Sequence, residues 1–156
     1  VGADAGDLGG AGQGAGVGGR LGLATDLAGG AVTLAGIARA ISLYAQGLRD
    51  GSVAKLRQAF RPQAIVCGYI GEEGFVKPVD FLYQYVREQK AAVRKSPPPA
   101  PELRSVALHG RTATVILHER AYLGFDYDTS LQMIELKGRW WILAKLFDGT
   151  PARKRG

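Results

Sequence analysis

The sequence predicts an α+β domain in which a curved, mostly antiparallel sheet wraps around helices. Apolar residues recur at helical spacing between residues 37 and 60, at the start of the globular part. Most of the strand-like segments come later, and the last two apolar runs meet at the short polar connection 137–139, as in a hairpin. Helices first and strands last favour an α+β fold whose curved sheet encloses a pocket.

Residues 1–28 are predicted to form a disordered Gly/Ala-rich arm, or an extension outside the native coding sequence. Glycine at this density costs backbone entropy on ordering, and the segment contains no aromatic residue. It lacks a basic start, and Asp26 interrupts its apolar stretch, so neither a signal peptide nor a membrane span is expected. We expect one domain at residues 29–149 and a basic tail at 150–156.

The composition of the chain narrows its location and partners. Its 156 residues carry a formal charge of +6 and a single cysteine, Cys67. One cysteine excludes an intrachain disulfide and fits a cytoplasmic location. The basic residues between 87 and 95 lack an accompanying nucleic-acid motif, so we expect a solvated helix face and no nucleic-acid partner. Cys67, His109 and His118 give no zinc spacing, and neither a metal nor a cofactor is expected.

Three helices are predicted, each with a start or stop signal. Gly51 suits the left-handed position that ends the first helix, and Ser52 can cap the second. The pair 61–62, Arg-Pro, ends the second helix, and Pro78 can begin the third, where a missing N–H does no harm. One face of the first helix carries four apolar residues: Ile37, Ile41, Tyr44 and Leu48.

The predicted strands surround the third helix in the sequence. A β-branched and aromatic strand covers 64–70, and a turn at 71–74 follows it. The Pro-rich segment 96–101 is a stiff connector within the domain. An aromatic-rich loop before the third of the later strands is predicted to carry Asp126 and Asp128. The later strands are predicted at residues 103–109, 111–122, 129–137 and 139–147.

Four short motifs, in this order and spacing, carry a family resemblance. They are Tyr44-x-x-Gly47-x-x-x-Gly51, Leu56-x-x-x-Phe60, Val66-x-Gly68-Tyr69, and Gly138-Arg139-Trp140-x-Ile142-x-x-Lys145-x-Phe147. With them, residues 37–149 resemble the nuclear transport factor 2-like superfamily, and most of all its small bacterial proteins called putative lumazine-binding. The resemblance implies a cone-shaped α+β fold, with three helices packed on a curved sheet and a pocket for a small apolar or aromatic ligand.

Enzymes of that superfamily include ketosteroid isomerases, dehydratases and polyketide cyclases, and the resemblance lets their reacting groups be traced here. Tyr44 matches the isomerase tyrosine, but Gly68 falls where the general base stands. Gln132 falls where the second acid stands, and His118 matches the cyclase histidine. The carboxylate partner of either pattern is therefore missing, and acid–base catalysis needs such a group.

Strand alternation decides which residues could enter the pocket. It places His118 on one face and Glu119 on the other, and we expect Glu119 at the outer surface. His118 could be a hydrogen-bonded, half-buried residue or an acid–base group in the pocket. The predicted pocket residues are Tyr44, Tyr69, His118, Gln132 and Trp140.

Three hypotheses follow for function. The first is a binding module for a small apolar or aromatic molecule, without catalysis. The second is an isomerase-, dehydratase- or cyclase-type enzyme that uses His118 as acid or base. The third is a dimerisation domain whose cone is filled. Both faces of the last strand are apolar, so all three include a homodimer through the outer sheet face.

Overall fold

A computed structural model gives the backbone of residues 18–154 and the side chains of residues 29–154. The chain divides into two compact units, Val1–Leu34 and Ala35–Gly156, and the sheet lies in the second. In chain order the elements are α1 (Gly18–Asp50), α2 (Val53–Ala59), β1 (Phe60–Ile70), β2 (Glu73–Pro78), α3 (Val79–Lys95), β3 (Glu102–His109), β4 (Thr112–Tyr122), β5 (Phe125–Leu136) and β6 (Arg139–Pro151). The predicted α+β class and the order of the elements are confirmed.

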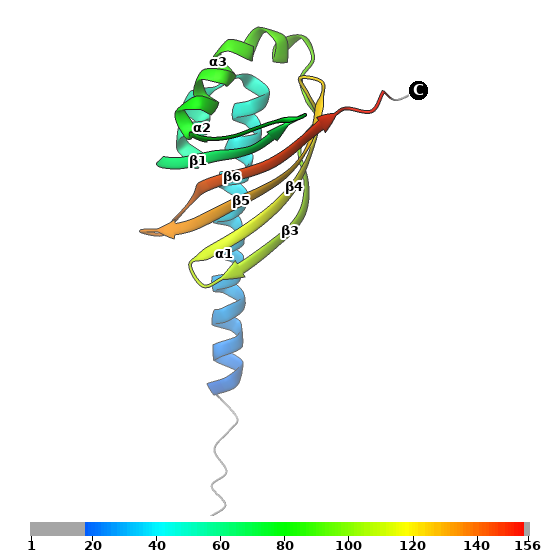
Figure 1. The fold of residues 1–156 in the computed structure, drawn as a ribbon. Helices are drawn as coiled ribbons and strands as arrows, with labels where there is room; N and C mark the ends of the chain where they lie inside the picture. Colours follow the sequence, from blue (N-terminus) through cyan, green and yellow to red (C-terminus); the bar gives the residue numbers. More distant parts are fainter. Residues whose placement is uncertain (1–17, 155–156) are drawn as a thin grey trace, which may run out of the picture. The chain divides into compact units, whose positions relative to one another are not determined.

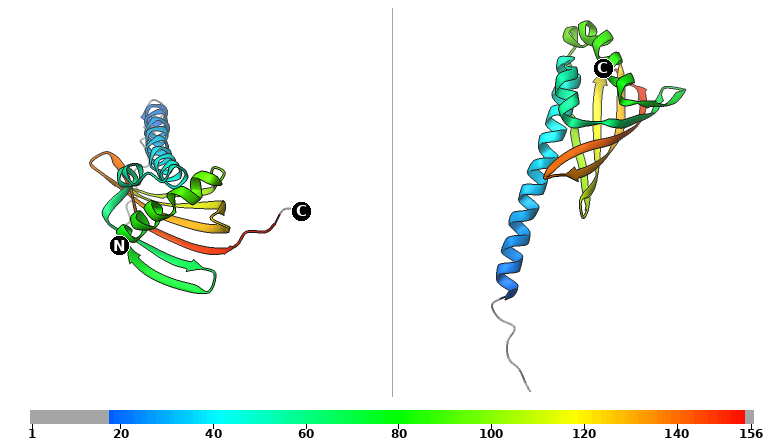
Figure 2. Two further views of the ribbon diagram at one scale, coloured as in Figure 1. Left: turned by 90° about the horizontal axis from the view of Figure 1, so that it is seen from above. Right: turned by 90° about the vertical axis from the view of Figure 1, so that its left-hand side faces the viewer.

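One six-stranded sheet contains every strand, in the order β2-β1-β6-β5-β4-β3. Neighbouring strands are antiparallel, except that β1 and β6 run parallel. The sheet is strongly curved, and α3 lies across one of its ends (Figures 1 and 2). The side chains of its inner face form one core with the buried residues of α1, α2 and α3.

The local signals for the helices act as expected. Gly51 follows α1 with a φ of +63°, a conformation that glycine adopts without steric cost. The Ser52 hydroxyl accepts a hydrogen bond from the Lys55 N–H at 3.3 Å and so caps α2. Pro78 stands one residue before α3, as its N-cap, instead of in its first turn.

Several boundaries differ from the prediction. Helix α1 begins at Gly18, so residues 18–28 are helical where an arm without structure was expected. Leu, Ala and Arg in this segment are good helix formers, and extending an existing helix costs less than starting one. The rest of the predicted arm, residues 1–17, lies outside the described residues. At the other end, β6 continues to Pro151, into the predicted tail.

Helix α1 contains a stretch, Gly29–Asp50, that is long and apolar enough to cross a membrane. Core helices of water-soluble domains meet the same criterion. From residue 37 onward this stretch packs in the core through Ile37, Ala40, Tyr44 and Leu48, all at most 5% exposed. Nearer the start of the stretch, Val32 and Leu34 are 75% and 49% exposed.

A bulge in β6 decides which residues of that strand face inward. Met133 of β5 pairs with Ile142 and Gln132 pairs with Ala144, so Leu143 is the extra residue. Before the bulge, Trp140 and Ile142 are buried. After it the alternation shifts by one position, and Lys145 becomes buried. The bulge therefore brings a lysine into the core.

Candidate functional site

The inner face of β4 carries Glu119, in line with Val115 and Leu117. Glu119 is only 6% exposed, so the prediction that it lies at the outer surface is wrong. The alternation of residues was predicted correctly, but the two faces of β4 were exchanged. A buried carboxylate needs partners that replace its hydration, and the neighbouring elements supply them.

Two hydroxyl groups hold the Glu119 carboxylate. The Tyr44 hydroxyl, from α1, donates to Glu119 Oε1 at 2.6 Å. The Thr129 hydroxyl, from β5, donates to Glu119 Oε2 at 2.5 Å. Hydrogen bonds to an ionised acceptor are short and strong. One carboxylate thus joins a helix and two strands inside the domain.

Lys145 of β6 completes this cluster. Its Nζ lies 3.8 Å from Glu119 Oε2, within range of an ion pair but too long for a hydrogen bond. The ammonium also lies 5.1 Å from the ring centroid of Tyr44, 5.0 Å from Phe147 and 5.9 Å from Tyr127. Aromatic faces at these distances stabilise a cation. Burial nevertheless lowers the pKa of Lys145, and the negative charge of Glu119 only partly opposes this.

A small cavity of about 40 Å³ adjoins the cluster, and both Glu119 and Lys145 line it. This space is large enough for water. Tyr122 also lines the cavity, and its hydroxyl is buried and has no hydrogen-bond partner among the described residues. Burial raises the pKa of Tyr122, so the phenol keeps its proton and remains a donor. Half of the residues that line the cavity are aromatic: Phe75, Phe81, Tyr85, Tyr122, Tyr127 and Phe147.

The lowered pKa of Lys145 predicts a pH dependence of stability. The unfolded chain keeps this proton up to the ordinary lysine pKa of 10.5, whereas the folded protein releases it at lower pH. Between those two values the unfolded state binds more protons, so the free energy of unfolding rises with pH. Above about pH 10 the raised pKa of Tyr44 acts in the opposite direction.

We therefore expect the wild type to gain stability relative to Lys145→Met as the pH rises from neutral toward about 10. Urea unfolding of both proteins at several pH values in this range measures the difference. A difference that stays constant with pH would contradict the burial of a titrating amine.

The predicted pocket residues lie on both sides of the sheet. Tyr44 is fully buried and belongs to the cluster. Trp140 is buried, but its ring packs against Gly36 of α1, away from the residues that line the cavity. Tyr69 is 55% exposed, on the strand face opposite the buried Val66. Gln132 is exposed and bonds to Thr114 and Ser130.

His118 also faces away from the cavity, on the side of β4 opposite Glu119. Its Nδ1 lies 2.9 Å from Oδ1 of Asp128, whose side chain is 83% exposed. Asp126 and Asp128 belong to β5 and not to a loop, because β5 begins at Phe125. The interior acid–base role predicted for His118 therefore has no geometric basis. A pair in contact with solvent adds little stability.

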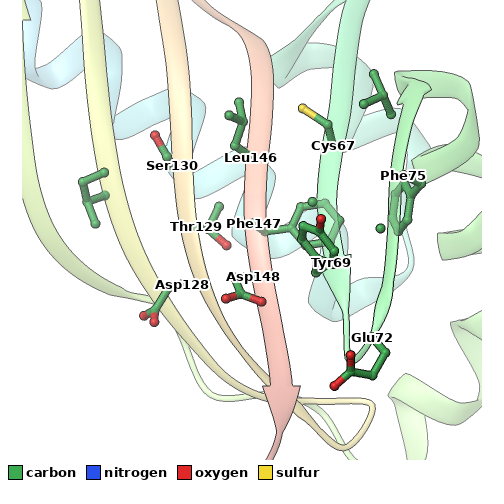
Figure 3. A pocket seen from close by; sticks show the side chains of 14 residues that line it. Cys67, Tyr69, Glu72, Phe75, Asp128, Thr129, Ser130, Leu146, Phe147 and Asp148 are labelled. Atoms are coloured by element: carbon green, nitrogen blue, oxygen red, sulfur yellow. The ribbon is translucent and has the colours of Figure 1, made fainter.

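A larger hollow lies on this outer face, a groove of about 890 Å³ between β1, β2, β4, β5 and β6. Cys67, Tyr69 and Leu146 form its apolar part, and Asp128 and Asp148 lie at one end (Figure 3). The groove is open to solvent and contains no buried charge. We prefer the smaller interior cavity as the candidate site because buried charges beside a cavity are costly and are concentrated at functional sites.

Most of the interior cluster was not predicted from the sequence: Glu119, Thr129, Lys145, Tyr122 and Tyr127. A signal for Glu119 was present, since Ala113, Val115 and Leu117 are all apolar and share its face. Lys145 could not be placed by alternation, because the bulge at Leu143 reverses its side. Within the described residues, no group of three His, Cys, Asp or Glu side chains could hold a metal ion.

Comparison with known proteins supports the same fold. The family model described as putative lumazine-binding matches residues 33–148. A protein of Silicibacter pomeroyi, described as NTF-2-like and of unknown function, is 19% identical and superposes with a TM-score of 0.68, covering 76% of this chain and 96% of that one. A similar protein of Shewanella baltica is 17% identical, with a TM-score of 0.64 and coverage of 77% and 95%. No curated protein matches the sequence.

Proposed function

Since the chain belongs to the putative lumazine-binding family of nuclear transport factor 2-like domains, we propose that it binds a small molecule in its interior cavity. The observation that carries this proposal is the Glu119–Lys145 pair beside an aromatic-walled cavity. A filled core gains nothing from two buried charges, because apolar residues of the same size would stabilise it as well or better.

The ligand we propose is a small aromatic or heterocyclic molecule with polar groups at its edge. Lys145 and the Tyr122 hydroxyl can donate to an oxygen of the ligand, since neither has a close acceptor among the described residues. The rings of Tyr127 and Phe147 offer faces for stacking. A lumazine ring, which has two carbonyl groups on a flat heterocycle, has this chemistry.

The cavity as it stands, about 40 Å³, is too small for such a ring. Phe75 and Phe81 line it, with their centroids 5.1 Å apart, and Phe81 is 38% exposed. A partly exposed ring can change its rotamer at little cost. We propose that these two rings move when the ligand enters.

The enzymatic alternative loses its predicted residue, because His118 is outside the cavity. Glu119 is the carboxylate that remains, and hydroxyl donors already occupy both of its oxygens. Such a carboxylate is better suited to hold a ligand and a lysine than to remove a proton from carbon. Binding is therefore the better-supported function.

Calorimetric titration with lumazine and with a panel of small aromatic carbonyl compounds tests the proposal. We expect binding to the wild type and to Lys77→Met, which removes an exposed lysine, and a loss of at least about tenfold in affinity, or 1.4 kcal/mol, for Lys145→Met. Equal affinity of Lys77→Met and Lys145→Met for the ligand would mean that the ligand binds outside the interior cavity. Absence of any heat across the panel would favour a filled cone that serves only for dimerisation.

We further propose a cytoplasmic homodimer formed by the outer sheet face. One end of this face is basic, where Arg61 and Arg139 lie 5.4 and 4.0 Å from the Trp141 ring, and the other end carries Asp128 and Asp148. A two-fold axis through the face would bring the unlike ends of two copies together.

The dimer proposal predicts that Leu146→Arg, in the middle of this face, weakens self-association. Leu146 is 43% exposed in the single chain, so the substitution should cost less than about 1 kcal/mol in folding. A charge placed in an apolar contact would lose its hydration. Sedimentation equilibrium measures the effect. A wild type that stays monomeric at high micromolar concentration would contradict the dimer.

A further inference from the structure

Lys145 differs from the other lysines whose side chains the structure describes. It is 7% exposed, whereas Lys77, Lys90, Lys95, Lys137 and Lys154 are exposed and Lys55 is half-buried. Its Nζ is within reach of an acid, Glu119, and it lines an aromatic cavity. A lysine in apolar surroundings beside a proton carrier is arranged as a nucleophile.

We propose that Lys145 forms a reversible imine with a small carbonyl compound bound in the interior cavity. This inference rests on the proposed ligand-binding function and names the reactive class of ligand, an aldehyde or ketone with an apolar or aromatic body. We infer that the Lys145 amine reacts with the ligand, because an amine that served only as the counter-ion of Glu119 would not need to line a cavity.

The surroundings of Lys145 favour its neutral form, which is the form that reacts. Burial lowers the pKa of the amine, and rings at 5.0 to 5.9 Å keep bulk water away. The negative charge of Glu119 opposes the lowering of the Lys145 pKa, but at 3.8 Å the carboxylate does not make a close hydrogen bond to the ammonium. The remaining neutral fraction at pH 7 should therefore exceed that of an exposed lysine.

The reaction balances with the groups present. The nitrogen lone pair forms a C–N bond to the carbonyl carbon, and the π electron pair moves to the oxygen. The Tyr122 hydroxyl, which lacks a partner among the described residues, can donate a hydrogen bond to that oxygen. Glu119 accepts a proton from nitrogen and returns it to the oxygen. The C–O bond then breaks as the nitrogen lone pair forms the C=N bond, and the second amine proton passes through Glu119 to the departing oxygen. The two protons of the amine thus leave with the oxygen as one water molecule, and the reverse reaction releases the carbonyl compound.

Reductive trapping tests the proposal on the full-length wild type. The protein is incubated at pH 7 with formaldehyde, and separately with benzaldehyde, together with cyanoborohydride, which reduces imines to stable amines. Peptide mass spectrometry then gives the labelling rate of each lysine. Lys77 and Lys90 are internal controls because both are exposed.

We expect Lys145 to be labelled faster than the exposed lysines. A lowered pKa leaves a larger fraction of the amine neutral at pH 7, and the neutral amine is the form that attacks the aldehyde. Its rate should also reach half of its maximum at a lower pH than theirs. A buried lysine with only a structural role would be labelled more slowly, because the reagents reach it less often.

Labelling of Lys145 that is no faster than that of Lys77 and Lys90, with both aldehydes, would overturn the proposal. The failure of this proposal can be told apart from a failure of the ligand-binding proposal. If calorimetry shows binding that depends on Lys145 but trapping fails, the ligand binds without a covalent bond. If trapping succeeds, Lys145→Arg should lose the label at this position alone.

Discussion

Replacing Glu119 with alanine should lower the free energy of unfolding by about 3–5 kcal/mol at pH 7. The substitution leaves the Lys145 ammonium buried without its counter-ion and removes the acceptor of the Tyr44 and Thr129 hydroxyls. The buried ammonium can become neutral by losing its proton. Because an ordinary lysine pKa is about 10.4, removing this proton at pH 7 costs about 5 kcal/mol, which is the upper limit of the penalty for the unpaired charge. The loss should therefore become smaller as the pH rises.

Urea unfolding of two companion variants gives the control. Glu73→Ala removes an exposed glutamate from β2 and should change stability by less than about 0.5 kcal/mol. The double variant Glu119→Leu/Lys145→Met removes both charges and should recover the part of the loss that comes from the unpaired ammonium, since an apolar pair of similar size needs no counter-ion. The Tyr44 and Thr129 hydroxyls still lack their acceptor in it. If Glu119→Ala lowers the free energy of unfolding by less than about 1 kcal/mol, Glu119 does not make the buried contacts with Lys145, Tyr44 and Thr129.

Gly68→Ala should have an effect of similar size, for a steric reason. A Cβ at this position would overlap the main-chain carbonyl of Phe147, with which Gly68 is paired across the parallel β1–β6 ladder. Main-chain atoms in the middle of a sheet cannot move aside without breaking ladder hydrogen bonds. We expect a loss of more than about 3 kcal/mol or a protein that does not fold, since backbone displacement in a packed core is costly.

Gly110→Ala is the matched control for this substitution. Gly110 has a φ of +62° in the turn between β3 and β4, and open space surrounds the added Cβ. An alanine at this position would therefore be strained only by the left-handed backbone conformation, which should lower the free energy of unfolding by about 1 kcal/mol. Thermal unfolding measures the stability of both variants. If Gly68→Ala and Gly110→Ala lose the same stability, the close approach of the Phe147 backbone to Gly68 does not cause the loss in Gly68→Ala.

Gly68 also explains an observation made from the sequence. It occupies the position at which the resemblance to ketosteroid isomerases places a general base. The structure shows that any side chain there would meet the Phe147 backbone. The position is thus closed to a carboxylate on steric grounds.

Much of the fold could be predicted because its signals are local. Gly51 and Ser52 mark the junction of α1 and α2, and Lys137–Gly138 forms the turn between β5 and β6. Helical spacing of apolar residues marks the buried side of α1. The start of α1 at Gly18 was missed because glycine content was weighed more heavily than the Leu and Ala between the glycines.

The candidate site depended on non-local facts that the sequence does not contain. Alternation along β4 separates His118 from Glu119 but does not say which face is inside. His118 was expected in the interior. Glu119 lies in the interior instead, because the hydroxyls of Tyr44 and Thr129 donate hydrogen bonds to its carboxylate. Those partners are 75 and 10 residues away in the chain. Lys145 is turned inward by a bulge that only pairing with β5 defines.

The most direct test of the central claim is mass spectrometry of small molecules released from the natively purified protein. The protein is first re-exposed to a cell metabolite extract, and the wild type is compared with Tyr69→Ala and Lys145→Met. The first variant alters the outer groove and the second alters the interior cavity. We predict one aromatic or heterocyclic compound, bound near one equivalent per chain by the wild type and Tyr69→Ala and largely lost in Lys145→Met. A compound lost in Tyr69→Ala instead, or none bound by the wild type, would contradict the interior site.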